Sequence, residues 1–209
     1  MHIITKKVTL LPASFVGTKI RVKPAGSLIW GIHAAELAEG SASVLIDWGD
    51  GTRQSCSEVN DLTHTYPAEG VYEVRISDDI STLCCSDYQG DFREVYAPQI
   101  VGLESNATKL KTLGVSAFDN ASSLTEFVIP AERIESRVFA DCSNLQVARL
   151  LNVKEIGGSI LPSRPFYGCA ALREIHFSEV NRTDIEATPY YATDPTFGSK
   201  TDVQLFFES

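Results

Sequence analysis

The chain has 209 residues, of which 44% are hydrophobic and 22% are charged, and its formal net charge is -9. This composition is that of a globular protein, which excludes extensive disorder. The acidic balance argues against binding to nucleic acid phosphates or to an anionic membrane surface. Because no stretch reaches the roughly 18 apolar residues of a membrane span, we expect no insertion into a bilayer.

Short apolar runs between turn residues fill the first part of the chain, from Ile3 to about Leu83. The N-terminal "HIITKKVTL" is a poor signal peptide and is better explained as a strand. Further strands are expected in "TKIRVKP", "SLIWGIHA", "SVLIDWGD" and "VYEVRISD", and "HAAELAEG" is compatible with a single helical turn. "KIRVK" and "YEVRI" alternate with period two, which predicts one buried and one solvated face. Several short strands at this spacing predict an all-β sandwich.

The stretch "DWGDGT" predicts a tight hairpin. Asp50-Gly51 is a strong hairpin dipeptide because the turn requires positive φ, and an aspartate also bonds its own downstream amides. Trp48 follows the apolar run "VLI" and is expected in the core. A calcium loop is the alternative interpretation, but Asp47 and Asp50 lack the D-x-D-x-D-G ligand spacing. We expect a pair between His64 and one of these aspartates to be a structural hydrogen bond under the hairpin rather than an acid/base pair.

The same region resembles the PKD (polycystic kidney disease) domain family. The matching residues are the hairpin from Trp48 to Thr52 and the later "HTYPAEGVYEV". The resemblance implies an immunoglobulin-like β-sandwich, usually extracellular, that serves as a spacer or a binding module. Within this stretch, Tyr66 stands where a tyrosine corner would bond its hydroxyl back to the backbone.

The second half of the chain contains an internal repeat. Three segments, "SAFDNASSLTEFVIP", "RVFADCSNLQVARLL" and "RPFYGCAALREIHF", share a phenylalanine, a Cys or Ala three residues later, and a leucine three residues after that. One unit of this kind cannot bury its apolar face alone, so neighbouring units are expected to stack into a solenoid. The keyed residues are Phe118, Phe139 and Phe166, with Leu124, Leu145 and Leu172.

This pattern resembles the BspA-like leucine-rich repeats of bacterial surface proteins over about residues 92–180. "FADCSNLQVARL", "FYGCAALREIHF" and "EIGGS" carry the resemblance, while Ala121 replaces the repeat cysteine and the period is irregular. Cys142 and Cys169 occupy the inward slot of the repeat, so we expect them to be reduced and buried. The final "TDVQLFF" is expected to form a terminal strand that caps the stack.

The predicted fold is therefore mostly β, with an N-terminal immunoglobulin-like β-sandwich followed by a short leucine-rich-repeat solenoid. We place the boundary in "CCSDYQGD", which gives a PKD-like domain at residues 1–86 and a repeat domain at residues 87–209. The chain contains no phosphate-binding, dinucleotide-binding, zinc-protease or nucleophile-elbow motif, and its five cysteines include no C-x2-C pair. We therefore expect no enzymatic activity, no cofactor and no metal site.

The resemblances imply a non-catalytic bacterial surface protein, extracellular or at the cell surface, or a phage-associated one, that binds a protein or glycan partner through its repeats. A purely structural spacer of an envelope or phage tail is the alternative. Residues between the inward ones of a repeat strand face outward, which places Arg149, Arg173 and His176 one or four residues after a keyed leucine. We predict this basic strip as a site for an acidic glycan or protein, with His176 strengthening binding below pH about 6.5. An ordinary solvated surface is the alternative interpretation.

Overall fold

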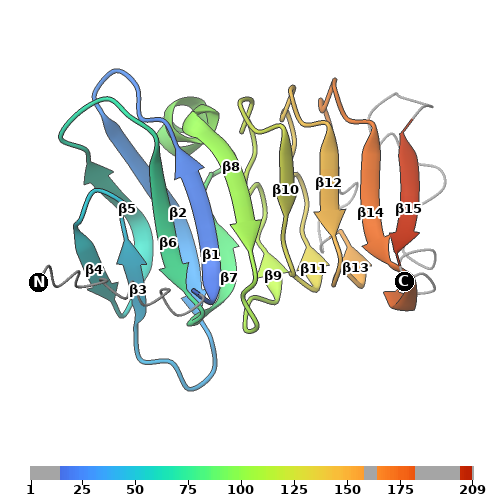
Figure 1. Ribbon diagram of the computed structural model, residues 1–209, viewed down its shortest axis with the longest axis horizontal. Coiled ribbons are helices and arrows are strands. Elements are labelled where there is room, and N and C mark those ends of the chain that lie inside the picture. The colour runs from blue at the N-terminus through green and yellow to red at the C-terminus, as the bar shows by residue number, and fades with distance from the viewer. Residues whose placement is uncertain (1–14, 158–163, 182–202, 209) are drawn as a thin grey trace, which may run out of the picture.

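The computed structural model describes residues 15–157, 164–181 and 203–208, and its strands form two long β-sheets (Figure 1). The sheets lie one behind the other, and the chain advances from the N-terminal strands at one end to β15 at the other. One hydrophobic cluster fills the molecule from Ile20 near its start to Phe177 near its end. The prediction of a mostly β fold is confirmed. In the described ranges, no helix is long and apolar enough to cross a bilayer.

Among the residues that the structure describes, the larger sheet has nine strands and mixes two kinds of pairing. Strands from the first half of the chain pair antiparallel, whereas the repeat strands pair in parallel. In spatial order, the strands are β15 (Gln204–Glu208), β14 (Glu174–Ser178), β12 (Val147–Leu150), β10 (Glu126–Val128), β8 (Ile100–Ser105), β1 (Gly17–Val22), β6 (Tyr72–Ser77), β3 (Val44–Asp47) and β4 (Arg53–Cys56).

Within the described ranges, the smaller sheet has six strands, and two of the three short helical turns lie on the chain between the two sheets. In spatial order, its strands are β13 (Glu155–Ile156), β11 (Arg133–Ile134), β9 (Thr112–Leu113), β7 (Ile80–Cys84), β2 (Ile29–Leu37) and β5 (Val59–Thr65). The helical segments are the π-helix η1 (Phe92–Tyr96) and the 3-10 helices η2 (Ala97–Gln99) and η3 (Glu179–Asn181).

Local residue patterns explain several strands of the first half. In β1, Ile20 and Val22 are buried while Arg21 between them is exposed, which confirms the predicted alternation. The helical turn expected in "HAAELAEG" is wrong, because β2 continues to Leu37 and pairs with β5 on one side and β7 on the other. β4, β5 and β7 were not predicted, since their mixed polar sequences lack a long apolar run. The strand predicted in "HIITKKVTL" lies outside the described residues.

The "DWGDGT" hairpin forms as predicted, with β3 and β4 paired antiparallel. Trp48 is only 1% exposed, which confirms its place in the core. Gly49 has φ 84°, and a Cβ there would lie 2.7 Å from the carbonyl oxygen of Glu73, so the turn requires glycine. Beneath the hairpin, Nε2 of His64 lies 2.8 Å from Oδ2 of Asp50, and the imidazole stacks on Trp48 with ring centres 4.9 Å apart. The predicted structural hydrogen bond is therefore confirmed.

Tyr66 is buried, but the tyrosine-corner prediction is wrong. Among the described residues, its hydroxyl has no hydrogen-bond partner. Its ring instead stacks on Tyr72, with centroids 4.2 Å apart, and meets the ring of His64 edge-on at 4.8 Å. Aromatic packing thus holds this side chain, and its burial raises the pKa of the phenol above the ordinary value.

The two halves of the chain share both sheets. In the larger sheet, β8 pairs antiparallel with β1 and in parallel with β10. In the smaller sheet, β7 pairs in parallel with β9. The division into residues 1–86 and 87–209 stays a prediction, and the hydrogen-bonded ladders run across it without a break (Figure 1).

The repeats stack through their keyed residues. Phe118, Phe139 and Phe166 are buried and form a ladder of nearly parallel rings, with centroids 5.5 and 5.6 Å apart. Cys142 and Cys169 are free and buried, as predicted, and each thiol donates to the main-chain oxygen of the phenylalanine in the preceding repeat, over 3.2 and 3.0 Å. The stack ends with β15, which pairs in parallel with β14 and confirms the predicted terminal strand.

Candidate functional site

The basic strip predicted on the repeat strands is only partly assembled. Arg149 and His176 are register partners on β12 and β14. Arg173 precedes β14, and its Nη2 donates to Oε1 of Gln146 over 2.6 Å. Nη1 of Arg149 lies 3.4 Å from a carboxylate oxygen of Glu126. The strip therefore lies among acidic and amide side chains.

His176 belongs to the ladder that was expected to face outward, but β15 covers it. It is only 9% exposed, and its ring stacks on Phe206 with centroids 4.7 Å apart. Its Nδ1 lies 2.5 Å from Oε1 of Glu208, and its Nε2 lies 3.2 Å from Oε2 of Glu174. The terminal strand supplies these neighbours, which the spacing of the repeats does not reveal. A role for Arg149, Arg173 and His176 in partner binding stays a prediction.

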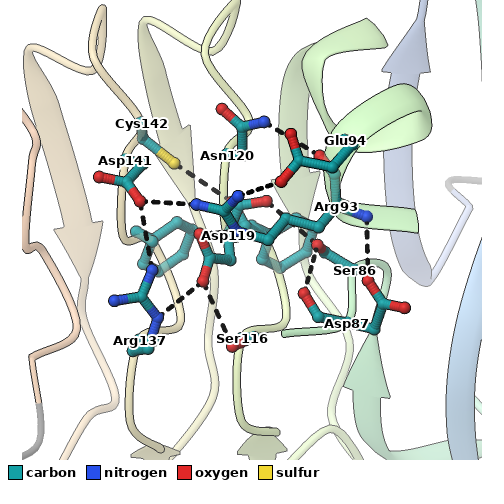
Figure 2. Close-up of polar contacts among 12 residues, drawn as sticks. Ser86, Asp87, Arg93, Glu94, Ser116, Asp119, Asn120, Arg137, Asp141 and Cys142 are labelled. Atoms are coloured by element: carbon teal, nitrogen blue, oxygen red, sulfur yellow. Dashed lines mark hydrogen bonds and ion pairs between the residues drawn. The ribbon is translucent and has the colours of Figure 1, made fainter. Parts of the chain in front are cut away.

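A second polar cluster lies where the longer turns of the solenoid lead from the smaller sheet to the larger one. We call this region the long-loop edge, and it comprises residues 84–96, 114–125, 135–146 and 164–173. Figure 2 shows its polar side chains converging from η1 and from two successive repeat turns. Segments far apart in the sequence therefore supply one connected set of charges.

Asp119 is the centre of this set. It is fully buried, and its two carboxylate oxygens accept hydrogen bonds from Nε of Arg93 over 3.1 Å and from Nε of Arg137 over 2.9 Å. Oδ2 of Asp141 lies 2.7 Å from Nη2 of Arg93 and 3.2 Å from Nη2 of Arg137. Glu94 forms a further ion pair with Arg93. Three carboxylates thus hold two guanidinium groups in fixed orientations (Figure 2).

Burial and the neighbouring charges shift the pKa values of these groups in opposite directions. Burial raises the pKa of Asp119, in spite of the hydrogen bond and charge of Arg137. For Arg93, burial disfavours the cation, but the charges of Asp119 and Glu94 raise its pKa. Because an arginine side chain does not give up its proton in a protein, the two guanidinium groups are suited to binding and orientation rather than to proton transfer.

Tyrosine and arginine side chains alternate in a stack beside this network. The guanidinium carbon of Arg137 lies 5.3 Å from the ring centre of Tyr88 and 6.0 Å from that of Tyr167. The guanidinium carbon of Arg164 lies 5.5 Å from the same Tyr167 ring. These separations are within the range of about 6 Å for cation–π attraction. Tyr88 is 58% exposed and Tyr167 is 44% exposed, so the stack presents two aromatic rings to solvent.

The repeat turns impose an unusual backbone conformation on Arg137. Its φ is 58°, in the left-handed region that few residues other than glycine adopt. Ser116 occupies the same repeat position and has the same φ, which indicates that the turn rather than the side chain sets this conformation. The backbone also has positive φ four residues later in each turn, at Asn120, Asp141 and Gly168. The site is therefore built on a recurrent feature of the repeat.

A hollow of about 470 Å³ opens at the long-loop edge. Its lining combines one aromatic ring with several polar and charged side chains. The lining residues are Tyr88, Gln89, Gly90, Arg93, Glu94 and Arg137.

Sequence reasoning missed these residues. The available signal was the arginine two positions before the keyed phenylalanine in both "RVF" and "RPF", that is, Arg137 and Arg164. Tyr88 carries no repeat signal, because it lies in the segment in which we placed the domain boundary, and Arg93 lies just after that segment, ahead of the first aligned repeat. Only the stacking of η1 against the first repeat turn brings Arg93 to Asp119.

The histidine under the hairpin is not arranged as a catalytic relay. Nε2 of His64 lies 2.8 Å from Asp50 and 3.4 Å from Oγ1 of Thr52, so both groups contact the same ring nitrogen. A Ser-His-Asp type relay instead uses the two nitrogens of the ring for its two partners. In the part of the chain that the structure describes, no group of three or more His, Cys, Asp or Glu side chains is placed to hold a metal ion.

Comparison with protein families matches residues 97–193 to the BspA type leucine rich repeat region, with six copies. This match begins at η2 and confirms the resemblance predicted for the repeat half. The comparisons do not support the predicted resemblance of the first half to PKD domains. Comparison with curated proteins and with solved structures gave no match.

Proposed function

We propose that the protein is a non-catalytic recognition module that binds a protein or glycan partner through its repeat half. The family match over residues 97–193 supports this, because stacked repeats combine side chains of successive units into one extended binding surface. In this proposal, the first half is an immunoglobulin-like sandwich that carries the repeats. The protein acts outside the cell or at its surface, or as part of a virion.

The observation that carries the proposal is the exposed stack of Tyr88, Arg137, Tyr167 and Arg164. Tyrosine and arginine are the residue types enriched at binding hot spots. Asp119 and Asp141 fix the orientation of Arg137 before any partner arrives. A side chain that is already ordered loses less conformational entropy on binding, which favours affinity.

Two alternatives to this proposal are a different binding surface and a purely structural function. The partly exposed side chain of Arg149 on β12 favours the outer face of the larger sheet as a binding surface. The continuity of both sheets through the chain favours a purely structural spacer of an envelope or phage tail. These candidates predict different responses to the same set of variants.

The test compares the wild type with Tyr88→Ala/Tyr167→Ala and with Arg149→Ala/Arg173→Ala on arrays of purified glycans and purified extracellular proteins. Thermal melts of each variant control for folding. We expect the wild type to bind and the tyrosine variant alone to lose at least about tenfold in affinity, as removal of hot-spot residues does. A loss of affinity in the arginine variant alone would indicate that the partner binds to the larger sheet instead. A wild type that binds nothing on either array would favour the spacer.

A further inference from the structure

We propose that the hollow at the long-loop edge binds a neutral sugar unit of a glycan. This inference rests on the proposed recognition function and identifies the partner of the protein as a glycan with neutral sugars. It concerns the pocket formed by Tyr88, Gln89, Arg93, Glu94 and Arg137, which the repeat pattern alone does not predict.

The size and lining of the hollow favour a small hydroxylated ligand. Its volume of about 470 Å³ lies within the usual range for small-molecule sites, about 300–1,000 Å³. Four of its lining side chains are polar or charged, and Tyr88 provides one apolar surface. An apolar anchor from a protein partner would exclude water from the amide of Gln89, the carboxylate of Glu94 and Nη1 of Arg137 without offering hydrogen bonds in return, at a cost in affinity. Sugar hydroxyls can satisfy these groups.

The charges around the hollow favour a neutral ligand over an acidic one. The two guanidinium groups of Arg93 and Arg137 already face the carboxylates of Asp119, Asp141 and Glu94. An anion would therefore meet no unbalanced positive charge. The formal net charge of -9 on the whole chain further opposes the approach of a polyanion.

The hydrogen-bonding groups of the hollow suit pairs of hydroxyls, each of which both donates and accepts. Arg137 uses Nε and Nη2 in its ion pairs, which leaves Nη1 outside them as a donor. The side chain of Glu94 is 59% exposed and provides a hydrogen-bond acceptor. The side-chain amide of Gln89 provides both a donor and an acceptor. The exposed ring of Tyr88 offers an apolar platform for the C–H face of a sugar.

The test uses an array that carries neutral oligosaccharides of hexoses and N-acetylhexosamines, sialylated and sulfated glycans, and extracellular proteins stripped of their glycans. The variants are Tyr88→Ala and Gln89→Ala, both at exposed positions. Because Tyr88→Ala removes the ring that contacts Arg137, thermal melts of both variants control for folding. Phe206→Ala is the matched control, because it removes an exposed aromatic ring from β15, outside the hollow. The neutral glycan that binds the wild type most tightly is then titrated into each protein by calorimetry.

We expect the wild type and Phe206→Ala to retain neutral glycans, and Tyr88→Ala and Gln89→Ala each to bind about tenfold more weakly. Binding should change little between about 0.05 and 0.5 M salt, since a neutral ligand forms no screened ion pairs. Binding to acidic glycans only, with loss in high salt, would overturn the inference. The inference would also be overturned if the wild type bound no glycan, or if both variants bound neutral glycans as tightly as the wild type does. Binding to stripped proteins only, lost in Tyr88→Ala, would overturn the sugar but leave the proposed recognition function standing.

Discussion

Asp119 and Arg137 lie 18 residues apart in the sequence and meet in a buried ion pair, with Oδ2 of Asp119 2.9 Å from Nε of Arg137. The carboxylate has no exposed surface and comes from one repeat turn, while the guanidinium comes from the next. This pair therefore links two successive repeats and holds the arginine that reaches between Tyr88 and Tyr167.

Replacing the buried carboxylate of Asp119 should destabilise the protein more than replacing the partly exposed carboxylate of Asp141. Asp119→Asn leaves Arg93 and Arg137 facing a neutral amide, and we expect a loss of about 2–3 kcal/mol, somewhat below the cost for a fully buried pair. Asp141→Asn is the matched control, because it contacts the same two arginines but is 34% exposed at its side chain, and should cost under about 1 kcal/mol. Urea denaturation of both variants measures the difference, and equal losses would contradict this account.

Asp50 should make the protein less stable in acid. Burial opposes ionisation of this carboxylate, but hydrogen bonds from Thr52 and His64 hold its pKa at about 2, below the ordinary 3.8. A lowered pKa contributes stability that is present above pH about 4 and is lost as the pH falls through about 2.

The test of this contribution is Asp50→Asn, which cannot ionise. Between about pH 5 and pH 2, the wild type should lose on the order of 1 kcal/mol more stability than Asp50→Asn does. Chemical denaturation at several pH values in this range measures both slopes. Parallel slopes for the two proteins would show that Asp50 does not contribute.

Trp48 should be essential to the first half of the fold. It is 1% exposed, and His64 stacks on its ring. Trp48→Ala should cost roughly 3–5 kcal/mol, the usual range for removal of a buried aromatic side chain. Leu45→Ala, on neighbouring β3 but 46% exposed, should cost far less in the same thermal melts. A Trp48→Ala protein that melts like the wild type would refute the assignment.

Phe139 should stabilise the repeats more than any exposed ring does. It is the middle ring of the ladder with Phe118 and Phe166, and it also stacks on Phe127 with centroids 4.0 Å apart. Phe139→Ala should cost about 3–5 kcal/mol because the cavity opens between three other rings. Phe206→Ala, at the exposed face of β15, should cost much less. Similar unfolding free energies for the two variants would argue against the ladder as the repeat core.

The cysteines should be unreactive until the protein unfolds. Cys142 and Cys169 are buried and donate to main-chain oxygens, and burial raises the pKa of Cys142 well above its ordinary value. Burial also raises the pKa of Cys84 to about 11. Since the thiolate is the reactive form, alkylation should be slow in native protein and complete in denaturant, as followed by mass spectrometry. Rapid native alkylation of Cys142 and Cys169, or a mass that shows a bond between them, would contradict this.

Features that depend on local order could be predicted from the amino-acid sequence. Alternation in β1, the Asp50-Gly51 hairpin and the inward Phe118, Phe139 and Phe166 all follow from side-chain periodicity and turn chemistry, which act over a few residues. The repeat positions of Cys142 and Cys169 follow in the same way. The structure confirms each of these predictions.

How segments that are distant in the sequence meet became visible only in the folded protein. The pairing of β8 with β1 on one side and β10 on the other joins the two halves into shared sheets, and no local pattern specifies that pairing. The same is true of β15 covering His176 and of Tyr88 reaching Arg137. Contacts between segments dozens of residues apart depend on how the whole chain packs and on strand register, which local periodicity leaves open.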